Sequence, residues 1–468
     1  MISINDNLSP QDLLPHITHL WELSAGKIRD IENTWSPENG APVFTVEGRY
    51  TARGWTEWTQ GFQYGSSLLQ FDATDEREFL ERGRKNTFER MAGHLTHAGV
   101  HDHGFNNVST YGNLWRLLRE GRISPNPEER AFYELALRCS GAVQARRWTR
   151  IREGGGFIYS FNGPHSLFAD TMRSLRSLAL AHRLGHVLME EHDTPVSLLQ
   201  RLLEHARTTA TYTVYYGEGR DIYDVRGRVA HESIFNINDG NYRCPNSQQG
   251  YSPFTTWTRG LAWVMCGFAE QLEFIQTLPD SELQPFGGRV EVTAWMLRAA
   301  RATCDFYIEN TPTDGIPYWD TGAPGLRHLG DYLERPAEPF NDYEPVDSSA
   351  AAIAAQGLLR LGRYLQQHGK ASEGHRYYQC GLSVAATLLR EPYLSVDPKH
   401  QGLLLHSVYH RPNGWDYVPP GAKIPCGESS MWGDYHLREL ALLLQRLADG
   451  SPYYTFFGPL HEETGGVP

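Results

Sequence analysis

The sequence predicts an all-α protein in which twelve helices form six hairpins that close into a toroid. Three observations support this prediction: apolar residues recur at helical spacing in twelve segments, strand signals are weak, and long loops alternate with short links. The 468-residue chain is 40% hydrophobic and 21% charged, which is typical of a globular protein with a large core. No Ser-, Gly- or Pro-rich linker interrupts it, so we expect a single domain over residues 1–468.

The expected helices follow from apolar periodicity, and several have start or stop signals. Ser9-Pro10 marks one start, while Gly185 and His368-Gly369 mark ends. Strand signals are confined to short loops such as 157–160 and 212–215. The helices are expected over residues 11–33, 57–70, 75–97, 110–119, 128–147, 166–185, 195–215, 257–276, 289–309, 347–368, 371–390 and 430–447.

Long segments rich in Gly, Trp, His and Asp separate many of these helices. Because long loops gathered at one rim build a pocket, this alternation favours a closed toroid over an open solenoid, the alternative architecture. The expected pocket-forming loops lie near residues 99–109, 148–165, 216–256, 310–346 and 391–429.

Composition excludes several classes of partner. The net charge is −12 at pH 7 and no basic stripe is visible, so we expect no nucleic-acid binding. No run of 18 apolar residues predicts a membrane span, and the first residues lack a signal-peptide pattern, so we expect a cytoplasmic protein unless a leader was removed. The six cysteines form no CxxC pair, and we expect no metal and no other cofactor. The oligomeric state does not follow from the sequence.

One predicted helix contains Trp257, Arg259 and Trp263 within two turns. Aromatic faces bind the C–H surfaces of sugars, and a guanidinium binds a carboxylate with two parallel hydrogen bonds. The group therefore suits an acidic sugar. The alternative is an amphipathic helix with a buried aromatic stripe and a solvated arginine.

Two aspartates are candidates for acid–base chemistry. Asp102 lies between two histidines in the first long loop, where it is alternatively a helix-entry or turn residue. Asp170 lies in the opening turn of a core helix, where the helix dipole lowers the pKa of a carboxyl and burial raises it. The balance between these effects decides whether Asp170 holds a proton near neutral pH.

Five segments, in order over residues 50 to 447, resemble the unsaturated glucuronyl hydrolases of glycoside hydrolase family 88, with family 105 as a relative. No single segment is specific, but five in register are hard to obtain by chance. They are His101 to Phe105, Gly154 to Ile158 followed by Asp170-Thr-Met, Gln249 to Tyr251 ahead of Trp257 to Trp263, Val346 to Ala355, and Glu428 to Tyr435.

The resemblance implies an (α/α)6 barrel and an enzyme that removes a 4,5-unsaturated uronic acid from the non-reducing end of lyase-generated oligosaccharides. In such enzymes an acid protonates C4 of the vinyl ether, water adds at C5, and the hemiketal collapses and releases the remaining sugar. One residue serves as acid and then base, and a second carboxylate orients water or stabilises positive charge.

The resemblance also implies roles for individual residues. Asp170 matches the general acid/base and Asp102 its partner carboxylate. Ser348 is expected to cap a helix, with a substrate contact as the alternative, and Trp432 and Asp434 are expected to close the barrel seam. The residues expected to bind substrate are Trp58, His101, His205, Gln249, Arg259 and Trp263, with an outer-face position as the alternative for His205.

Arg173 departs from the family pattern, in which the catalytic aspartate is usually followed by Met-Met-Asn or a similar run. On the same helical face as Asp170, Arg173 would either pair with it and depress its pKa or bind a sulfate or second carboxylate of the substrate. The loop over 217–247, rich in Arg, Asp, Asn and Tyr, is expected to form part of the pocket wall, with a surface excursion packed on a subunit neighbour as the alternative.

Other functions remain open on sequence alone. A sugar epimerase or isomerase on the same barrel would use histidines such as His101, His103, His205 and His231 as acid and base. Another glycosidase acting on an acidic sugar, or a non-catalytic sugar-binding protein, would keep the Trp and Arg platform. The polysaccharide source, the linkage and the sulfation preference do not follow from the sequence.

Overall fold

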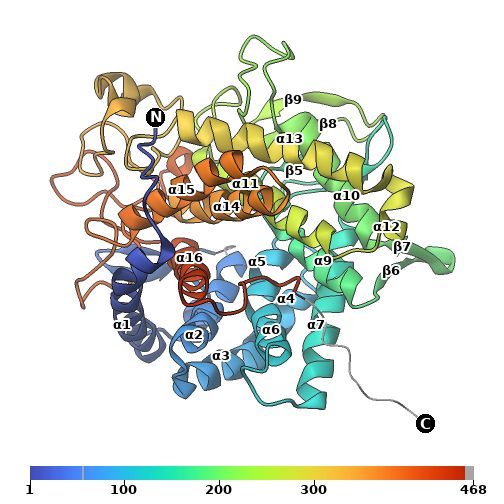
Figure 1. Ribbon diagram of the computed structural model, residues 1–468, viewed down its shortest axis with the longest axis horizontal. Coiled ribbons are helices and arrows are strands. Elements are labelled where there is room, and N and C mark those ends of the chain that lie inside the picture. Colours follow the sequence, from blue (N-terminus) through green and yellow to red (C-terminus); the bar gives the residue numbers. More distant parts are fainter. Residues whose placement is uncertain (55–56, 459–468) are drawn as a thin grey trace.

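A computed structural model describes residues 1–54 and 57–458, and it is mainly helical (Figure 1). Six inner helical segments follow one another around a ring. The last of them, α16, packs on the first, α2. The ring is therefore closed, and the open solenoid is excluded. The inner helices are α2 (Gln60–Thr74), α5 (His103–Asn107) with α6 (Asn113–Arg119), α8 (Thr171–Ser174) with α9 (Arg176–Arg183), α11 (Thr258–Gln276), α14 (Ser348–Gln367) and α16 (Met431–Asp449).

Six outer helices pack against this inner ring. Their buried residues recur every three to four positions and leave the other face to solvent, whereas α11 and α14 are buried almost all round. The outer helices are α1 (Pro10–Thr34), α3 (Arg77–Arg90), α7 (Pro127–Arg146), α10 (Leu198–Thr208), α13 (Gly288–Glu309) and α15 (Ala371–Leu388). Short helices α4 (Ala92–Leu95) and α12 (Asp280–Leu283) lie between them.

All twelve expected helices are present, with corrections at their starts. The helix expected at 110–119 begins at His103 and passes through a π-helical turn, Val108–Gly112. The helix expected at 166–185 begins only at Thr171, because Ser166–Phe168 forms strand β5. The helix expected at 195–215 begins at Leu198, because Thr194–Ser197 forms strand β7.

Strands are more numerous than the sequence predicted: nine short ones occur in the described part of the chain, all in antiparallel pairs or a triplet. Period-2 patterns are too short in three- to five-residue strands to be recognised. The pairs are β1 (Pro42–Val46) with β2 (Arg49–Ala52), β3 (Trp148–Arg150) with β4 (Gly156–Ile158), and β6 (Val187–Glu190) with β7; the triplet is β5, β8 (Glu232–Phe235) and β9 (Tyr242–Asn246). The triplet fixes the chain just before Asp170.

No helix within 1–54 or 57–458 has both the length and the apolar character needed to cross a bilayer.

Candidate functional site

A cleft of about 490 Å³ opens where the N-terminal ends of α5, α8 and α11 meet. Two of its walls come from loops within 99–109 and 391–429, and one side chain each comes from 148–165 and 216–256. The loop over 310–346 contributes no lining side chain among the described residues. Seven predicted site residues line the cleft: Trp58, His101, Asp102, Asp170, Gln249, Arg259 and Trp263.

The two aspartates lie at adjacent helix starts, joined by one histidine. Asp102 precedes α5 and Asp170 precedes α8, and their side chains keep 11% and 12% of their surface exposed. Nε2 of His101 lies 3.1 Å from Oδ1 of Asp170 and 3.8 Å from Oδ1 of Asp102. His101 therefore holds the two carboxylates in one ionisable cluster.

Close packing of α5 on α8 brings these helix starts together. A Cβ on Gly104 would lie 2.2 Å from the carbonyl oxygen of Ser174, so only glycine fits this contact. The amide of Gly104 donates to Oγ of Ser174, and this hydroxyl donates to the carbonyl of His101. Ser174 thus ties both sides of Asp102 to the helix that Asp170 begins.

The electrostatics of the cluster separate the two carboxyl groups. Burial raises the pKa of Asp102, and the neighbouring charge of Asp170 adds to that rise. Burial acts in the same direction on Asp170, but the charge and hydrogen bond of His101 outweigh it and lower the pKa of Asp170. Burial opposes protonation of His101, yet Asp102 and Asp170 together raise its pKa. These shifts favour a proton on His101 over one on Asp170.

Two further histidines lie near Asp170 without lining the cleft. Nδ1 of His205 accepts from the amide of Ile158 at 2.9 Å, and the side chain is fully buried. His205 is thus not among the residues that line the cleft, and its role in substrate binding stays a prediction. His231 accepts from the amide of Gln249 at 3.2 Å and packs on Phe168 and Trp257, so it supports the cleft wall from behind.

Aromatic rings form a continuous floor under the cleft. Trp58 stacks on Trp432 with ring centroids 5.0 Å apart and contacts Phe105 edge-on at 6.1 Å. Phe105 in turn lies 4.8 Å from Trp263. This floor offers apolar faces of the kind that bind sugar C–H surfaces. Trp432 belongs both to this floor and to the start of α16.

Arg259 lines the cleft, but its terminal nitrogens are already engaged. Nη1 lies 2.7 Å from Oδ2 of Asp347 and also donates to the carbonyl of Val408. Nη2 donates to the carbonyl of Tyr409 at 2.8 Å and to Oε1 of Gln249 at 3.2 Å. The side chain is neither solvated nor available for a two-pronged grip on a carboxylate. The solvated alternative is wrong, because Arg259 is buried, and the substrate-binding role of Arg259 stays a prediction.

Arg173 and Ser348 lie outside the cleft, contrary to prediction. The guanidinium of Arg173 is fully buried and pairs with Glu270 at 2.5 Å and Glu439 at 2.9 Å. Its ion pairs are therefore with these two glutamates and not with Asp170, and its side chain does not line the cleft.

The hydroxyl of Ser348 donates to the carbonyl of Leu405 at 2.6 Å, and Asp347, not Ser348, caps α14. Asp434 accepts from the amides of Leu403 and Leu404, which fastens the loop before α16.

Trp257 also lines the cleft, as expected of the group that it forms with Arg259 and Trp263, whereas sequence reasoning did not assign four lining residues to the site. Phe105 stands inside a motif that was recognised for other residues. The other three lie in loops without any periodic pattern: Phe161, Tyr409 and His410. Only the density of aromatic and histidine residues in these loops could have indicated them. The predicted loop over 217–247 supplies no lining side chain and supports the wall through His231.

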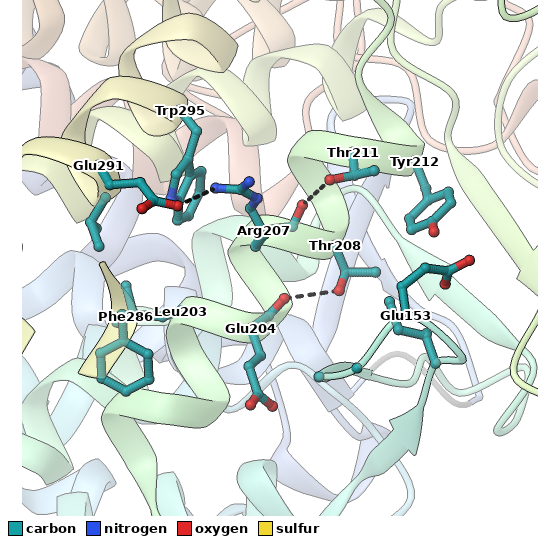
Figure 2. A pocket seen from close by; sticks show the side chains of 14 residues that line it. Glu153, Leu203, Glu204, Arg207, Thr208, Thr211, Tyr212, Phe286, Glu291 and Trp295 are labelled. Atoms are coloured by element: carbon teal, nitrogen blue, oxygen red, sulfur yellow. Dashed lines mark hydrogen bonds and ion pairs between the residues drawn. The ribbon is translucent and has the colours of Figure 1, made fainter. Parts of the chain in front are cut away.

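A second, roomier cavity of about 1030 Å³ lies on the outer wall between α10 and α13 (Figure 2). Arg207 lies over the ring of Trp295 and 3.9 Å from Glu291, so its charge is partnered. Glu153 and Glu204 leave the remainder acidic, which does not suit an acidic ligand. None of the predicted site residues lies there. Within the described ranges no cluster of three or more His, Cys, Asp or Glu residues has the arrangement of a metal site.

The chain resembles known proteins over most of its length. No protein-family model matches the chain. The unsaturated glucuronyl hydrolase of Bacillus sp. (strain GL1) is 26% identical over 409 residues, covering 86% of this chain and 90% of the relative. The unsaturated chondroitin disaccharide hydrolase of Streptococcus pyogenes serotype M1 is 23% identical over 459 residues, covering 96% of this chain and 94% of the relative.

Solved structures show the same fold. An unsaturated glucuronyl hydrolase specific for heparin superposes with a TM-score of 0.69 at 17% identity, covering 93% of this chain and 98% of the other. The Bacillus sp. GL1 enzyme superposes with a TM-score of 0.66 at 22% identity, covering 92% and 97%. The predicted (α/α)6 barrel is confirmed, and the chain is a relative of the unsaturated glucuronyl hydrolases.

Proposed function

We propose that this protein is a glycoside hydrolase that releases a 4,5-unsaturated uronic acid from the non-reducing end of acidic oligosaccharides. The observation that supports this most is the cluster of Asp102, His101 and Asp170 above an aromatic floor. His101 lies 3.1 Å from the carboxylate of Asp170 and 3.8 Å from that of Asp102, so the three groups supply acid, base and charge stabilisation in one place. The relatives named above add that enzymes with this fold act on unsaturated uronides.

Asp170 serves first as the acid in this proposal. The proton passes from Nε2 of His101 to Oδ1 of Asp170 along their 3.1 Å contact and then to C4 of the vinyl ether. Positive charge develops at C5 and the ring oxygen, where an ionised carboxylate stabilises it. Water adds at C5 while Asp170, now ionised, takes its proton, and the hemiketal opens and expels the remaining sugar. The cluster ends with the proton count it began with.

Asp102 acts as the partner carboxylate. Its place beside His101 lets it orient the attacking water, and its raised pKa makes it sensitive to the charge of the bound substrate. Trp58, Trp263 and Gln249 bind the unsaturated sugar, and Arg259 holds Gln249 in place. We also infer a single catalytic domain over residues 1–468 and a cytoplasmic location.

Replacing Asp170 by asparagine tests this function. The variant is expected to lose at least a thousandfold in kcat on a lyase-generated unsaturated disaccharide while still binding it, because the amide cannot transfer the proton. Asp305→Asn on the outer helix α13 is the matched control and retains activity. Unchanged turnover in Asp170→Asn would eliminate the assignment.

The alternative functions predict other products. An epimerase or isomerase converts a saturated sugar and leaves no ring-opened acid, and a binding protein shows no turnover at all. Assays on saturated and unsaturated versions of one disaccharide therefore distinguish the three possibilities.

A further inference from the structure

A short ledge of backbone lies behind the cleft wall that carries Gln249 and Trp257. Residues 318–321 run antiparallel to 256–258: the amide of Thr258 donates to the carbonyl of Trp319 at 3.1 Å, and the amide of Thr321 donates to the carbonyl of Thr256 at 3.0 Å. This ledge belongs to the loop over 310–346, which lines no part of the cleft.

Asp320, at the centre of the ledge, is completely buried. Its Oδ2 accepts from the amide of Tyr251 at 2.8 Å, and its Oδ1 accepts from the amide of Gly322 at 2.9 Å. Tyr251 is two residues from Gln249, whose side chain reaches Arg259 inside the cleft. The carboxylate of Asp320 thus connects residues 318–321 to residues 249–257, the strip that forms this wall of the cleft.

The fit around this carboxylate is tight. A Cβ on Gly250 would lie 2.9 Å from Oδ2 of Asp320, 2.9 Å from Cβ of Trp257 and 2.6 Å from Oγ of Ser247, so any larger residue would displace at least one of these groups. A shift of Asp320 or of Tyr251 consequently moves Gln249 directly.

Asp320 is also an unusual group to bury for stability alone. It forms no ion pair in the part of the chain that the structure describes, and its oxygens accept from the amides of Tyr251 and Gly322 and from the hydroxyl of Thr255 instead. A buried charge without a cation is generally less stabilising than an apolar residue of the same size. The presence of a buried carboxylate at position 320 is explained if this carboxylate positions the strip.

We propose that Asp320 is a positioning residue of the active site, which holds the strip from Gln249 to Trp257 in its substrate-binding geometry. This inference rests on the proposed function and adds a residue to it. Asp320 touches no substrate and acts through the backbone of Tyr251.

The charged surroundings of Asp320 make its effect depend on pH. Burial raises the pKa of Asp320 to about 6, and Glu344, the acidic group on its own loop, adds to the rise. On the strip side, His231 stays neutral because burial lowers its pKa to about 3, and Arg259 on α11 is paired with Asp347. Protonation of Asp320 as pH falls through about 6 therefore removes the negative charge that strengthens its hydrogen bond with the amide of Tyr251.

The test compares Asp320→Asn with Asp314→Asn. Asp314 lies on the same loop and also accepts a backbone amide, from Ile316, but does not touch the strip. For Asp320→Asn we expect KM on an unsaturated disaccharide to rise about tenfold with kcat changed less than threefold, because one charge-assisted hydrogen bond is lost. In the wild type KM rises as pH falls through about 6, and in Asp320→Asn that limb is absent.

Hydrogen exchange gives a readout independent of activity. Amide exchange in the peptide over 249–258 is expected to accelerate about tenfold in Asp320→Asn and to stay unchanged in Asp314→Asn. If Asp320→Asn does not fold, exchange of the wild-type peptide at pH 5 and pH 7, corrected for intrinsic rates, provides the same comparison.

The two hypotheses fail in different ways. Wild-type protein without activity on any unsaturated disaccharide overturns the proposed function. Active wild type, with Asp320→Asn keeping its KM, its pH limb and its exchange rates, overturns the positioning role alone. A kcat loss with unchanged KM and exchange also overturns it.

Discussion

Replacing Arg259 by methionine distinguishes two roles for this residue. As a structural hub it holds cleft residues in place through buried contacts, and as a substrate clamp it binds the substrate itself. Arg259 is 1% exposed and Asp347 is fully buried, so the change leaves the Asp347 carboxylate in the interior without its cation. Breaking one side of a buried ion pair reduces the free energy of unfolding by about 3–5 kcal/mol. The pair of Arg226 with Asp305 provides the control. Arg226 is 50% exposed and Asp305 keeps Arg376 as a partner at 2.7 Å, so Arg226→Met should cost less than about 1 kcal/mol.

The double variant Arg259→Met/Asp347→Asn sharpens the test. Removing both charges leaves no buried ion, so the two destabilisations should not add, with a coupling of about 0.5–3 kcal/mol. Chemical denaturation measures the four free energies of unfolding, and steady-state kinetics follow KM. Asp347→Asn alone should raise KM, although Asp347 does not line the cleft, because Arg259 then holds Gln249 and the carbonyl of Tyr409 less firmly.

A substrate clamp predicts the opposite pattern. Arg259→Met would then raise KM with a loss of stability no larger than that of Arg226→Met, and Asp347→Asn would leave KM unchanged. That combination would refute the hub.

Three more predictions follow from the contacts of the site. Gly104→Ala should lower kcat/KM more than tenfold and reduce Tm, because the new Cβ would lie 2.2 Å from the carbonyl oxygen of Ser174. The control Gly93→Ala should change neither quantity, because no atom lies within 4 Å of the new Cβ. Equal effects of the two variants would contradict the packing argument. Because the pKa of His101 is raised, the stability that its ion pairing contributes is present below about pH 6.5 and is lost as pH rises through the folded-state value, and kcat/KM should fall over the same range. An unchanged pH–rate profile in His101→Gln would exclude His101 as the proton source. Arg173→Met should lower the free energy of unfolding by about 3–5 kcal/mol and leave KM unchanged; a raised KM without loss of stability would restore the substrate role predicted from sequence.

The sequence predicted the barrel because helices carry their own periodic signal. Leu175, Leu178 and Ala179, for example, recur at helical spacing and are all buried. The helix starts were less certain, since β5 and β7 are too short to show alternation. The family resemblance of the ordered motifs singled out Asp102 and Asp170, which both lie immediately before inner helices and line the cleft.

The partners of the arginines could not be predicted. Arg259 meets Asp347, 88 residues away, and Arg173 meets Glu439, 266 residues away, so each contact exists only after the ring has closed. A local pattern cannot distinguish an arginine that awaits a ligand from one that is already paired. Asp320 could not be singled out from the sequence either, because its contact with the amide of Tyr251, 69 residues away, exists only in the folded chain.

The most direct test of the proposed chemistry follows the alkene itself. The protein is incubated with a panel of lyase-generated unsaturated disaccharides and with their saturated counterparts, while ultraviolet absorbance and released reducing sugar are recorded together. The proposal predicts that absorbance disappears at the rate at which the second sugar appears, that saturated disaccharides stay intact, and that Asp170→Asn stops both signals. Persistent absorbance alongside cleavage or epimerisation of a saturated sugar would contradict it.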